Sequence, residues 1–576
     1  MLIGDFRDKI ASLTASALPN SQAGDVPQVD IPKDPAHGDF STNVAMILAK
    51  SLRKKPREIA EGIVQRIGQT NDLLAGAPVI EGPGFINFRV SDRAWRGVIE
   101  EVIEKGENYG RSDIGAGEKV LVEFVSANPT GPLHIGHARG AAIGDSMARV
   151  LKFSGHDVTK EFYINDAGAQ VDILAKSVHA RWLELCNIKV DWENFGDYYP
   201  GEYVRDIAKY FSPQMFINTE ELKKIPAGAF HKSERENAIQ VIQNSIGNDL
   251  DDFKVEYDSW FYESKLYETN ATEMALKQLQ TQGDIFEKDG AVWFKVSKYQ
   301  PDEEDRVIRK SSGEWTYFAS DITYHRNKLE RGFQRLINVW GADHHGYIGR
   351  VKAALQALGF PPERLQVLLV QMVNLVRNGE PVRMGKRTGE FITLRDVLDE
   401  VGSDAMRFTF LTRGPNSHLD FDVDALKIKP GEDSEVKMSQ LREKNPVYYV
   451  QYAFARHKAI FRKAQEEGIN QDSVYVADLD LLTKPEEIEL AKKMERFPRE
   501  VAQAAVDAEP HRLSHYLLDL AGDFHRYYYM GDKDKSYRVI SEDRKVAQAR
   551  LALVAAVGWV VRNGLELLGV TAPDRM

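Results

Sequence analysis

Apolar residues recur along the chain with the spacing of strands in some segments and of helices in others. Residues 119–127, KVLVEFVSA, form an apolar run of strand length, and a glycine-containing turn and a helix over about 136–152 follow. A second strand is predicted at 158–166, VTKEFYIND, and another at 335–339, RLINV. Strand, turn, helix and strand in this order predict the start of a doubly wound parallel sheet.

The same periodicities divide the chain into four regions. Residues 1–113 mix helix and strand, with a helix expected over 44–55 and strand-like alternation at Ile86, Phe88 and Val90. Residues 114–400 carry the predicted sheet, interrupted by a helical, charged insertion at about 175–300. A connector of mixed pattern spans 401–440. Residues 441–576 are helical, and the segment 543–570 is apolar on most faces, so it should be buried.

Length and composition restrict the class of protein. A chain of 576 residues is expected to hold about three to five domains. The single cysteine, Cys186, excludes an intrachain disulfide and a multi-cysteine zinc site. Charged residues near the amino terminus and the short apolar run from Leu551 to Val561 provide neither a signal peptide nor a membrane span. We expect a soluble, cytoplasmic protein.

The net charge of −11 argues mildly against a general nucleic-acid binder, because phosphate contacts need Lys and Arg. A local basic surface on an acidic protein stays possible. The motifs must therefore decide whether the chain binds a nucleic acid.

The most informative segment is 126–140, SANPTGPLHIGHARG, where the first strand leads into the helix. His134 and His137 lie at the helix start, where ring nitrogens and free backbone N–H groups can bind phosphate. Gly136, Gly140 and Gly144 recur every four residues and give the helix a smooth face, which a nucleotide or the sheet can approach closely. Two solvated histidines on a capped helix would be the ordinary alternative, but the placement after a strand favours phosphate binding.

This segment resembles the first signature of class I aminoacyl-tRNA synthetases, and its longer form resembles arginyl-tRNA synthetases in particular. The resemblance implies an α/β multidomain protein with a Rossmann-type catalytic domain and its insertion. It adds an α+β amino-terminal domain that touches the outer corner of tRNA and an all-α carboxyl-terminal anticodon-binding domain. Arginine would be activated with ATP and transferred to tRNA(Arg), with His134 and His137 catalytic and Gly136 beside the ATP.

A second signature is expected on a loop near the end of the nucleotide fold. Asn378-Gly379 favours a tight hairpin turn. The glycine-flanked residues 383–389, RMGKRTG, then resemble the Lys-Met-Ser-Lys-Ser loop of the class, with Arg383, Gly385 and Arg387 as departures. The resemblance makes Lys386 and Arg387 catalytic and places Met384 beside ATP. A solvated basic turn is the alternative for this loop taken alone.

Recognition of a guanidinium group requires carboxylates with planar, two-pronged geometry. By resemblance, Tyr317 and Asp321 supply this recognition, and they would share one face if the segment is helical. Glu123, Ser126 and Asn128, at the end of the first strand, would hold the α-amino and carboxylate ends or line the arginine pocket. An ordinary helix start with a capping aspartate is the alternative for Tyr317 and Asp321.

Residues 339–346, VWGADHHG, follow a predicted strand, and a carboxylate there is well placed for a ribose hydroxyl. The resemblance assigns Gly341, Asp343 and His344 to ATP. Asp343, His344 and His345 could be mistaken for metal ligands, but no fourth ligand lies at useful spacing. We expect no zinc and no other protein-bound metal, with Mg²⁺ arriving with ATP.

The carboxyl-terminal region offers candidates for contact with tRNA. Tyr449, Tyr452 and Arg456 fall on one helix face, and aromatic rings beside arginine can stack on unpaired bases. An aromatic stripe with this spacing is also typical of a helix core. The resemblance places Tyr449, Tyr452 and the terminal Met576 beside the anticodon, in a protein expected to be a monomer without membrane contact.

Two alternatives stay open. The chain could be a class I synthetase for another amino acid, or a nucleotidyltransferase that shares the two-histidine signature, although Asp321 and the helical carboxyl-terminal region argue against both. It could also be a non-catalytic tRNA-binding homologue, which the presence of His134, His137 and Lys386 opposes.

Overall fold

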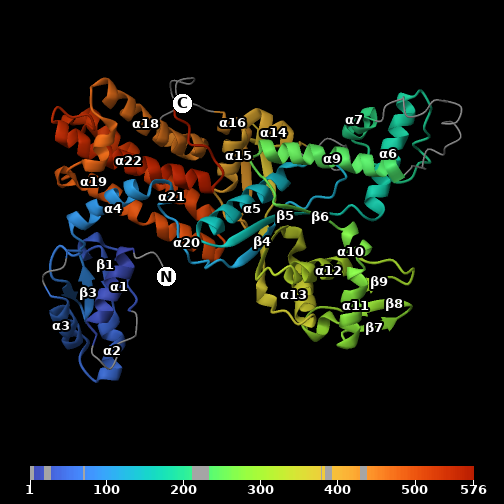
Figure 1. The fold of residues 1–576 in the computed structure, drawn as a ribbon, viewed down its shortest axis with the longest axis horizontal. Helices are drawn as coiled ribbons and strands as arrows, with labels where there is room; N and C mark the ends of the chain where they lie inside the picture. Colours follow the sequence, from blue (N-terminus) through green and yellow to red (C-terminus); the bar gives the residue numbers. More distant parts are fainter. Residues whose placement is uncertain are drawn as a thin grey trace. The chain divides into compact units, whose positions relative to one another are not determined.

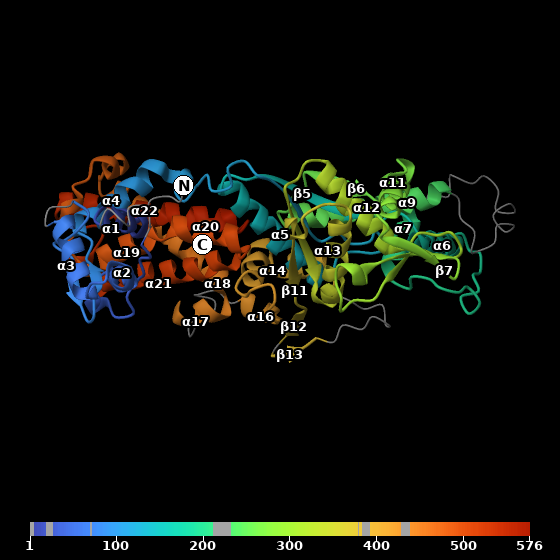
Figure 2. The same ribbon diagram turned by 90° about the horizontal axis from the view of Figure 1, so that it is seen from below.

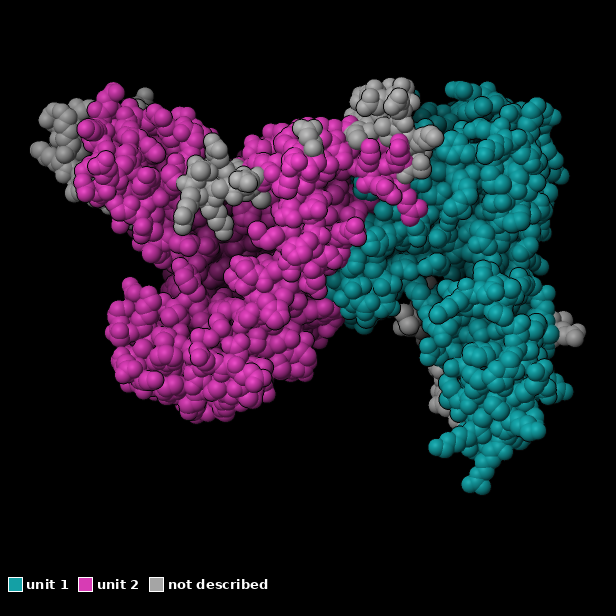
Figure 3. Space-filling view, turned by 180° about the vertical axis from the view of Figure 1, so that it is seen from behind, with its two compact units in different colours: residues 1–116, 153–155, 446–576 teal, residues 117–152, 156–445 magenta. Residues whose placement is uncertain are grey.

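The computed structural model describes residues 5–18, 27–68, 72–210, 232–377, 379–382, 392–427 and 438–576. The chain divides into two compact units (Figure 3). Unit 1 holds residues 1–116, 153–155 and 446–576, and unit 2 holds residues 117–152 and 156–445. Across the described residues, every helix is too short or too polar to cross a lipid bilayer.

The amino-terminal part of unit 1 is a small α+β layer. The described strands β1 (Phe40–Thr42), β3 (Phe85–Phe88) and β2 (Val79–Glu81) pair antiparallel in that order. Helices α1 (Phe6–Ser16), α2 (Val44–Leu52) and α3 (Pro56–Ile67) accompany this sheet (Figure 1). The predicted helix over 44–55 ends three residues early, because Arg53 adopts a left-handed conformation and Lys55 precedes Pro56.

The carboxyl-terminal part of unit 1 is a helical bundle, as its periodicity predicts. Its long helices are α18 (Pro446–Glu466), α19 (Pro485–Glu495), α20 (Phe497–Asp507), α21 (His511–Lys533) and α22 (Arg544–Leu567). Most side chains of α22 are buried, which confirms the prediction for the apolar segment. Helix α4 (Asp92–Lys105), from the amino-terminal region, packs against α19 and α22 (Figures 1 and 2). The Asn563 amide donates to the carbonyl oxygens of Gly106 and Tyr109 at 2.9 and 3.1 Å, so unit 1 contains both ends of the chain.

Unit 2 contains the expected doubly wound sheet. In the described residues, five strands pair in parallel in the order β11-β10-β4-β5-β6. They are β4 (Lys119–Glu123), β5 (Asp157–Ile164), β6 (Ser259–Tyr262), β10 (Arg335–Gly341) and β11 (Leu365–Val370). Helix α5 (Ile135–Phe153) leads from β4 to β5 on one side, whereas β10 lies on the other side of β4. The strand order therefore reverses between β4 and β10, where ligands of such sheets bind beyond the carboxyl ends.

The segment predicted as a helical insertion is only partly helical. It begins with α6 (Ala169–Leu185), α7 (Glu202–Tyr210) and α9 (Lys232–Asp252). It then contains β6 of the main sheet, the short helices α10 (Ser264–Glu268) and α11 (Ala271–Thr281), and β7 (Ile285–Lys288) and β8 (Ala291–Phe294), which form an antiparallel sheet with β9 (Arg306–Arg309). The prediction of helix throughout is wrong at these strands, because four residues are too few to reveal strand alternation between longer helices.

Beyond β11 the chain forms a second small sheet. The predicted hairpin is confirmed by the pairing of β12 (Val373–Arg377) with β13 (Glu380–Pro381), in which Arg377 pairs with Glu380. Asn378 of its turn lies outside the described residues. Gly379 has a φ of 78°, which favours glycine at this turn. Strand β14 (Leu419–Asp422) pairs parallel with β12, and α14 (Leu394–Val401) and α15 (Ser403–Phe410) lie between them in the chain.

Candidate active site

The two histidines of the first signature lie together where α5 begins. Their ring centroids are 3.7 Å apart and the rings are inclined by 25°. His134 Nδ1 accepts a hydrogen bond from the backbone N–H of Gly136 at 3.1 Å, and His137 Nδ1 accepts one from the N–H of His134 at 3.2 Å. Because both Nδ1 atoms accept, each neutral ring carries its proton on Nε2. The pair therefore offers two N–H donors at a helix amino terminus, where an anion is favoured.

The protonation state of His137 follows from its surroundings. Burial, together with the neighbouring His134, lowers the pKa of His137 to about 3. The ring is therefore neutral throughout the physiological range. A neutral ring stabilises phosphate through a directed hydrogen bond, with no positive charge that changes near pH 7.

The chain between β4 and the histidines holds unusual backbone conformations. Val125 and Ser126 have φ values of 67° and 42°, in the left-handed region that β-branched residues in particular avoid. Such outliers persist only where the surrounding structure imposes them, and they concentrate at functional sites. Here they turn the end of β4 so that the Ser126 hydroxyl donates to Glu123 Oε1 at 2.9 Å.

The glycine face of α5 meets the sheet. A Cβ atom on Gly144 would lie 2.2 Å from Cγ of Phe124, the residue that directly follows β4, so no other residue fits without displacement. A Cβ on Gly140 would lie 3.9 Å from Val339 of β10, in ordinary contact. Gly136 stands apart at the start of the helix, beside His134. Of the two partners that the sequence allowed for this face, the sheet occupies it at Gly144.

The residues predicted to hold arginine come from two places in unit 2. Glu123 is the last residue of β4 and is buried, whereas Asn128 lies in the loop after β4 and donates to the side chain of Gln170 at 2.7 Å. Tyr317 and Asp321 lie on α12 (Tyr317–Glu330), which confirms the helix on which their shared face depended. Tyr317 is 60% exposed, so its ring is available to a ligand.

Asp321 lies in an acidic environment. Its carboxylate accepts a hydrogen bond from the Tyr347 hydroxyl. Burial raises the pKa of Asp321 to about 7; the Tyr347 hydrogen bond opposes this shift, and the charges of Glu123 and Glu263 add to it. A bound cation would favour the charged form of a carboxyl group whose pKa is raised this far.

The sequence pattern missed several residues of this environment. Glu263, which follows β6, accepts hydrogen bonds from Tyr163 at 2.8 Å, Tyr267 at 2.7 Å and Ser320 at 2.9 Å. Tyr163 lies near the carboxyl end of β5. Glu263 carries no local motif, and only its position after a strand of the main sheet could have drawn attention to it.

The predicted adenosine contacts lie at the end of β10. Gly341 is the last residue of this strand, and Asp343 and His344 follow in the 3₁₀ turn η6 (Ala342–Tyr347). Both side chains are exposed, and Asp343 Oδ2 lies 3.7 Å from His344 Nε2. They therefore stand at the carboxyl edge of the sheet, next to the strand-order reversal between β4 and β10.

The second signature, residues 383–389, lies outside the described residues, and Met384, Lys386 and Arg387 with it. The chain resumes beside the first signature, because Thr393 forms an antiparallel bridge with His134 and the Leu394 N–H donates to the carbonyl oxygen of Leu133 at 2.7 Å. The described chain that follows the second signature is thus tied to the histidine segment.

In unit 1, one of the predicted anticodon residues, Tyr452, lies against the guanidinium group of Arg456. Tyr449 is buried, and its ring meets His525 edge-on at 4.8 Å, whereas Tyr452 is partly exposed. The Arg456 guanidinium lies 4.8 Å from the centre of the Tyr452 ring and donates to the Tyr529 hydroxyl at 2.9 Å. Met576 is 48% exposed at the end of the chain. Tyr449 therefore belongs to the interior of the bundle, in agreement with the alternative that the aromatic residues form a helix core. Tyr452 is partly exposed to solvent.

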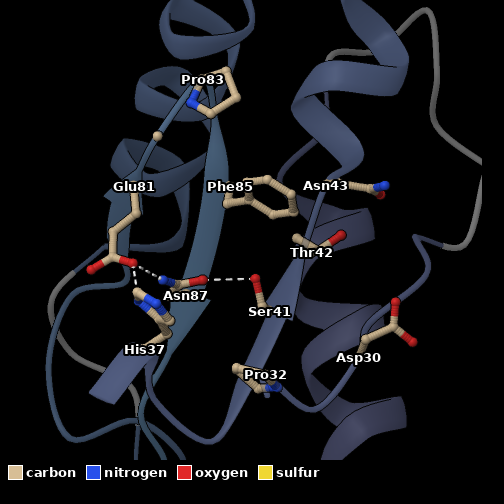
Figure 4. Close-up of a pocket in the computed structure, with 11 residues that line it drawn as sticks. Asp30, Pro32, His37, Ser41, Thr42, Asn43, Glu81, Pro83, Phe85 and Asn87 are labelled. Carbon is tan, nitrogen blue, oxygen red and sulfur yellow. Dashed lines mark hydrogen bonds and ion pairs between the residues drawn. The ribbon is translucent and has the colours of Figure 1, made fainter. Parts of the chain in front are cut away.

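A cavity of about 440 Å³ opens on the small sheet of unit 1 (Figure 4). The Phe85 ring borders it, and Asn87 lies between Ser41 and Glu81, accepting from the Ser41 hydroxyl at 2.7 Å and donating to Glu81 at 2.8 Å. His37 forms an ion pair with Glu81 in the same wall. The lining combines one aromatic face with amide, hydroxyl and carboxylate groups, a composition that suits a planar polar molecule.

Within the described ranges, no group of three or more His, Cys, Asp or Glu side chains is arranged to hold a metal ion. The Asp343–His344 pair accordingly has no third protein ligand among these residues.

Unit 2 is deeply hollowed on the face seen in Figure 3.

Comparisons with known proteins cover nearly the whole chain. Residues 4–90 match the arginyl tRNA synthetase N terminal domain, residues 98–412 the catalytic domain of class I (R) tRNA synthetases, and residues 450–576 the DALR anticodon binding domain. The arginine–tRNA ligase of Desulfosudis oleivorans is 46% identical over 98% of this chain and 96% of that protein. The arginine–tRNA ligase of Geobacillus kaustophilus is 44% identical over the full length of both. The arginyl-tRNA synthetase structure from Thermus thermophilus, at 24% identity, covers 99% of this chain and all of its own with a TM-score of 0.73, and it shares the fold.

Proposed function

The chain belongs to the arginyl-tRNA synthetase family, and from this we propose that it joins L-arginine to tRNA(Arg) at the expense of ATP. One observation carries the assignment of chemistry to unit 2. The pair His134 and His137, of which His137 is neutral, lies at the start of α5, in the same unit as the Asp321 carboxyl with its raised pKa. A phosphate-binding terminus and an acidic pocket are the two features that activation of a cationic amino acid requires.

The proposed reaction has two steps. The arginine carboxylate attacks the α-phosphorus of ATP, a new P–O bond forms, and pyrophosphate leaves with the electron pair of the broken bond. A hydroxyl of the terminal ribose of tRNA then attacks the carbonyl carbon of arginyl-adenylate, and AMP leaves. Neither step needs a covalent enzyme intermediate, so catalysis rests on positioning and on stabilisation of the developing charge.

We assign the phosphate contacts to the two signatures. His134 and His137 donate through Nε2 to phosphate oxygens at the amino terminus of α5, with Gly136 beside the nucleotide. Lys386 and Arg387 supply positive charge from the second signature, and Met384 lies against the nucleotide. The bridge between His134 and Thr393 supports this assignment, because Thr393 follows the second signature by only four residues in the chain.

Gly341, Asp343 and His344 are assigned to adenosine. They follow β10 at the reversal of strand order, where a carboxylate can accept from a ribose hydroxyl. The nucleotide would enter as its Mg²⁺ complex.

Arginine is placed between β4 and α12. Asp321 pairs with the guanidinium and Tyr317 covers it, while Glu123, Ser126 and Asn128 line the pocket or hold the amino-acid end. A neutral analogue such as citrulline would leave the buried carboxylate unpaired, which costs roughly 3–5 kcal/mol. The pocket therefore selects a planar cation rather than a shape alone.

The tRNA contacts are placed on unit 1. Tyr452, with Tyr449 behind it and Met576 at the chain end, would meet the anticodon. The cavity beside Phe85 and Asn87 suits an unpaired base from the outer corner of the tRNA, because its aromatic and amide groups match a base face and edge. We further propose that the enzyme acts as a cytoplasmic monomer and that bound tRNA orders the site before arginine is activated.

The test is ATP–pyrophosphate exchange with each amino acid, with and without total tRNA. Exchange with arginine that appears only when tRNA is added supports both the specificity and the coupling. Exchange with another amino acid would show that the pocket around Asp321 is misassigned. Absence of exchange under every condition would favour a non-catalytic tRNA-binding homologue.

A further inference from the structure

A buried ammonium group lies beside the proposed arginine pocket, and the proposed reaction assigns no role to it. Lys328 is on α12, seven residues after Asp321, and its side chain is fully buried. Its Nζ donates to Glu123 Oε2 at 2.5 Å and to Asn338 Oδ1 at 3.1 Å, and it lies 4.2 Å from the centre of the Tyr324 ring. Lysine is almost never fully buried unless it is paired, so this arrangement is a built feature of the fold.

The contacts of Lys328 belong to a chain of hydrogen bonds that joins the Glu123 carboxylate to the backbone carbonyl oxygen of Asp321. The His325 Nδ1 lies 2.8 Å from the carbonyl oxygen of Asp321, which can only accept, so Nδ1 carries the proton. His325 Nε2 then accepts from the Asn338 amide at 2.9 Å, which turns Asn338 Oδ1 toward Lys328. Asn338 is a buried residue of β10, so β4, β10 and α12 are held together at this point.

The charges around Glu123 come from several elements. Helix α12 contributes Asp321, Tyr324 and Lys328, and Arg331 lies at the end of that helix. Tyr257 comes from the chain before β6. The neutral side chains nearby are those of Asn338 and Ser126. Arg331 is engaged by Glu161 through two hydrogen bonds of 2.6 and 2.7 Å. Lys328 is therefore the cation in direct contact with Glu123.

We propose that Lys328 is a positioning residue for arginine recognition, which fixes the Glu123 carboxylate and balances its charge while the pocket is empty. The inference rests on the proposed role of Glu123 and Asp321 in binding arginine. Oε2 of Glu123 is held by Lys328 and Oε1 by the Ser126 hydroxyl, so the carboxylate has one orientation when the substrate arrives. Pre-organisation of this kind lowers the cost of binding.

The test is the pH dependence of kcat/KM for arginine in aminoacylation by Lys328→Met. Without its counter-ion, the buried Glu123 carboxylate would bind a proton more readily than in the wild-type enzyme. We expect KM for arginine to rise about 30-fold at pH 7 while kcat changes less than about threefold. Below pH 7, log(kcat/KM) for arginine should fall with a slope of two in Lys328→Met, whereas it should fall with a slope of one in the wild-type enzyme. A Lys328→Met enzyme with the wild-type pH profile, or with kcat and kcat/KM lowered equally at every pH, would overturn the proposal.

Arg331→Met is the matched control. It removes a cation at the end of the same helix from a buried carboxylate, Glu161, that is not assigned to the pocket. If Arg331→Met only disturbs the structure of α12, log(kcat/KM) for arginine should still fall with a slope of one below pH 7. A slope of two in this control would mean that general loosening of α12, rather than Lys328, produces the effect.

A second comparison holds even if Lys328→Met alone fails to fold. Glu123→Gln and the double variant Glu123→Gln/Lys328→Met bury no unpaired carboxylate at this position. If Lys328 acts through Glu123, the second substitution should change KM for arginine by less than about twofold on the Glu123→Gln background. A further large loss there would overturn the proposal. A Glu123→Gln enzyme with wild-type KM for arginine would contradict the assigned pocket itself, and the inference with it.

Discussion

At the residue scale, the tautomers of His134 and His137 decide what the site can offer a phosphate. Both Nδ1 atoms accept backbone N–H groups, so both Nε2 atoms are donors. The low pKa of His137 keeps that ring neutral above about pH 4, and it contributes no ionisation between pH 5 and 8. Any loss of activity in that range must arise from another group.

Replacement of His134 by Ala should lower the rate of arginine-dependent ATP–pyrophosphate exchange by about 10²–10³, because one preorganised donor to the transition state is lost. Lys386→Ala should have an effect of the same order. Circular dichroism and the unfolding transition should stay near those of the wild type, since the His134 side chain is exposed. Near-normal exchange in either variant would refute the catalytic assignment.

Asp321 provides an ionisation near neutral pH that His137 does not. Its folded-state pKa is about 7, against the ordinary value of 3.8, so the carboxyl is protonated below about pH 7 in the empty enzyme. We expect log(kcat/KM) for arginine to fall with a slope of one below pH 7, because a neutral carboxyl cannot pair with guanidinium. A profile that is flat between pH 5.5 and 8 would contradict this assignment.

The same shift affects stability. A carboxyl whose folded pKa is raised binds a proton more tightly in the folded state, so its cost to folding is absent below about pH 4 and complete above about pH 7. Asp321→Asn should therefore raise the unfolding free energy at pH 8 by roughly 1–3 kcal/mol, with a smaller gain at pH 5. It should also lower kcat/KM for arginine by about 10³ or more. Lower stability at pH 8 would show that the carboxylate is paired in the empty enzyme.

At the scale of elements, the contact between α5 and β4 sets the position of the histidines. Gly144 lies against Phe124, and a methyl group there would overlap the aromatic ring. Gly144→Ala should destabilise unit 2 by about 1–3 kcal/mol and reduce exchange activity, because α5 must move away from the sheet. Urea unfolding and ATP–pyrophosphate exchange together measure both effects.

Gly247→Ala is the control for this change. Gly247 lies within α9, and nothing within 4 Å would meet its Cβ. The substitution should be neutral or stabilise by up to about 1 kcal/mol, because alanine is the better helix former. Equal losses in the two variants would mean that close contact with Phe124 is not what Gly144 provides.

At the scale of the whole molecule, catalysis and tRNA recognition are assigned to different units. Tyr452→Ala should raise KM for tRNA about 10-fold in aminoacylation, since stacking on one base contributes about 1–3 kcal/mol. KM for arginine, measured at saturating tRNA, should change less than about twofold. Tyr475→Ala is a matched control, because this tyrosine is 67% exposed in the same unit. It is not among the tyrosines that contact the Arg456 guanidinium, which are Tyr452, Tyr528 and Tyr529. An unchanged KM for tRNA in Tyr452→Ala would remove Tyr452 from the proposed interface.

Local pattern was enough to predict the parts of this protein whose information lies within short stretches of chain. The strand–turn–helix around His134, the parallel sheet, the hairpin at 378–379 and the buried helix α22 each depend on the spacing of neighbouring residues. The family resemblance has the same origin, because its motifs are continuous segments. For that reason the fold class and the family followed from the sequence.

The tertiary structure decided which distant residues meet, and local pattern cannot encode this. Glu263 and Tyr347 join Asp321 only because β6, η6 and α12 are folded into one unit. Lys328 has the spacing of a surface lysine on a charged helix, yet the packing of α12 on β4 and β10 buries it against Glu123. Unit 1 combines both ends of the chain through α4 and α22. Burial and charge balance depend on contacts hundreds of residues apart, so the electrostatics of the site emerged only in three dimensions.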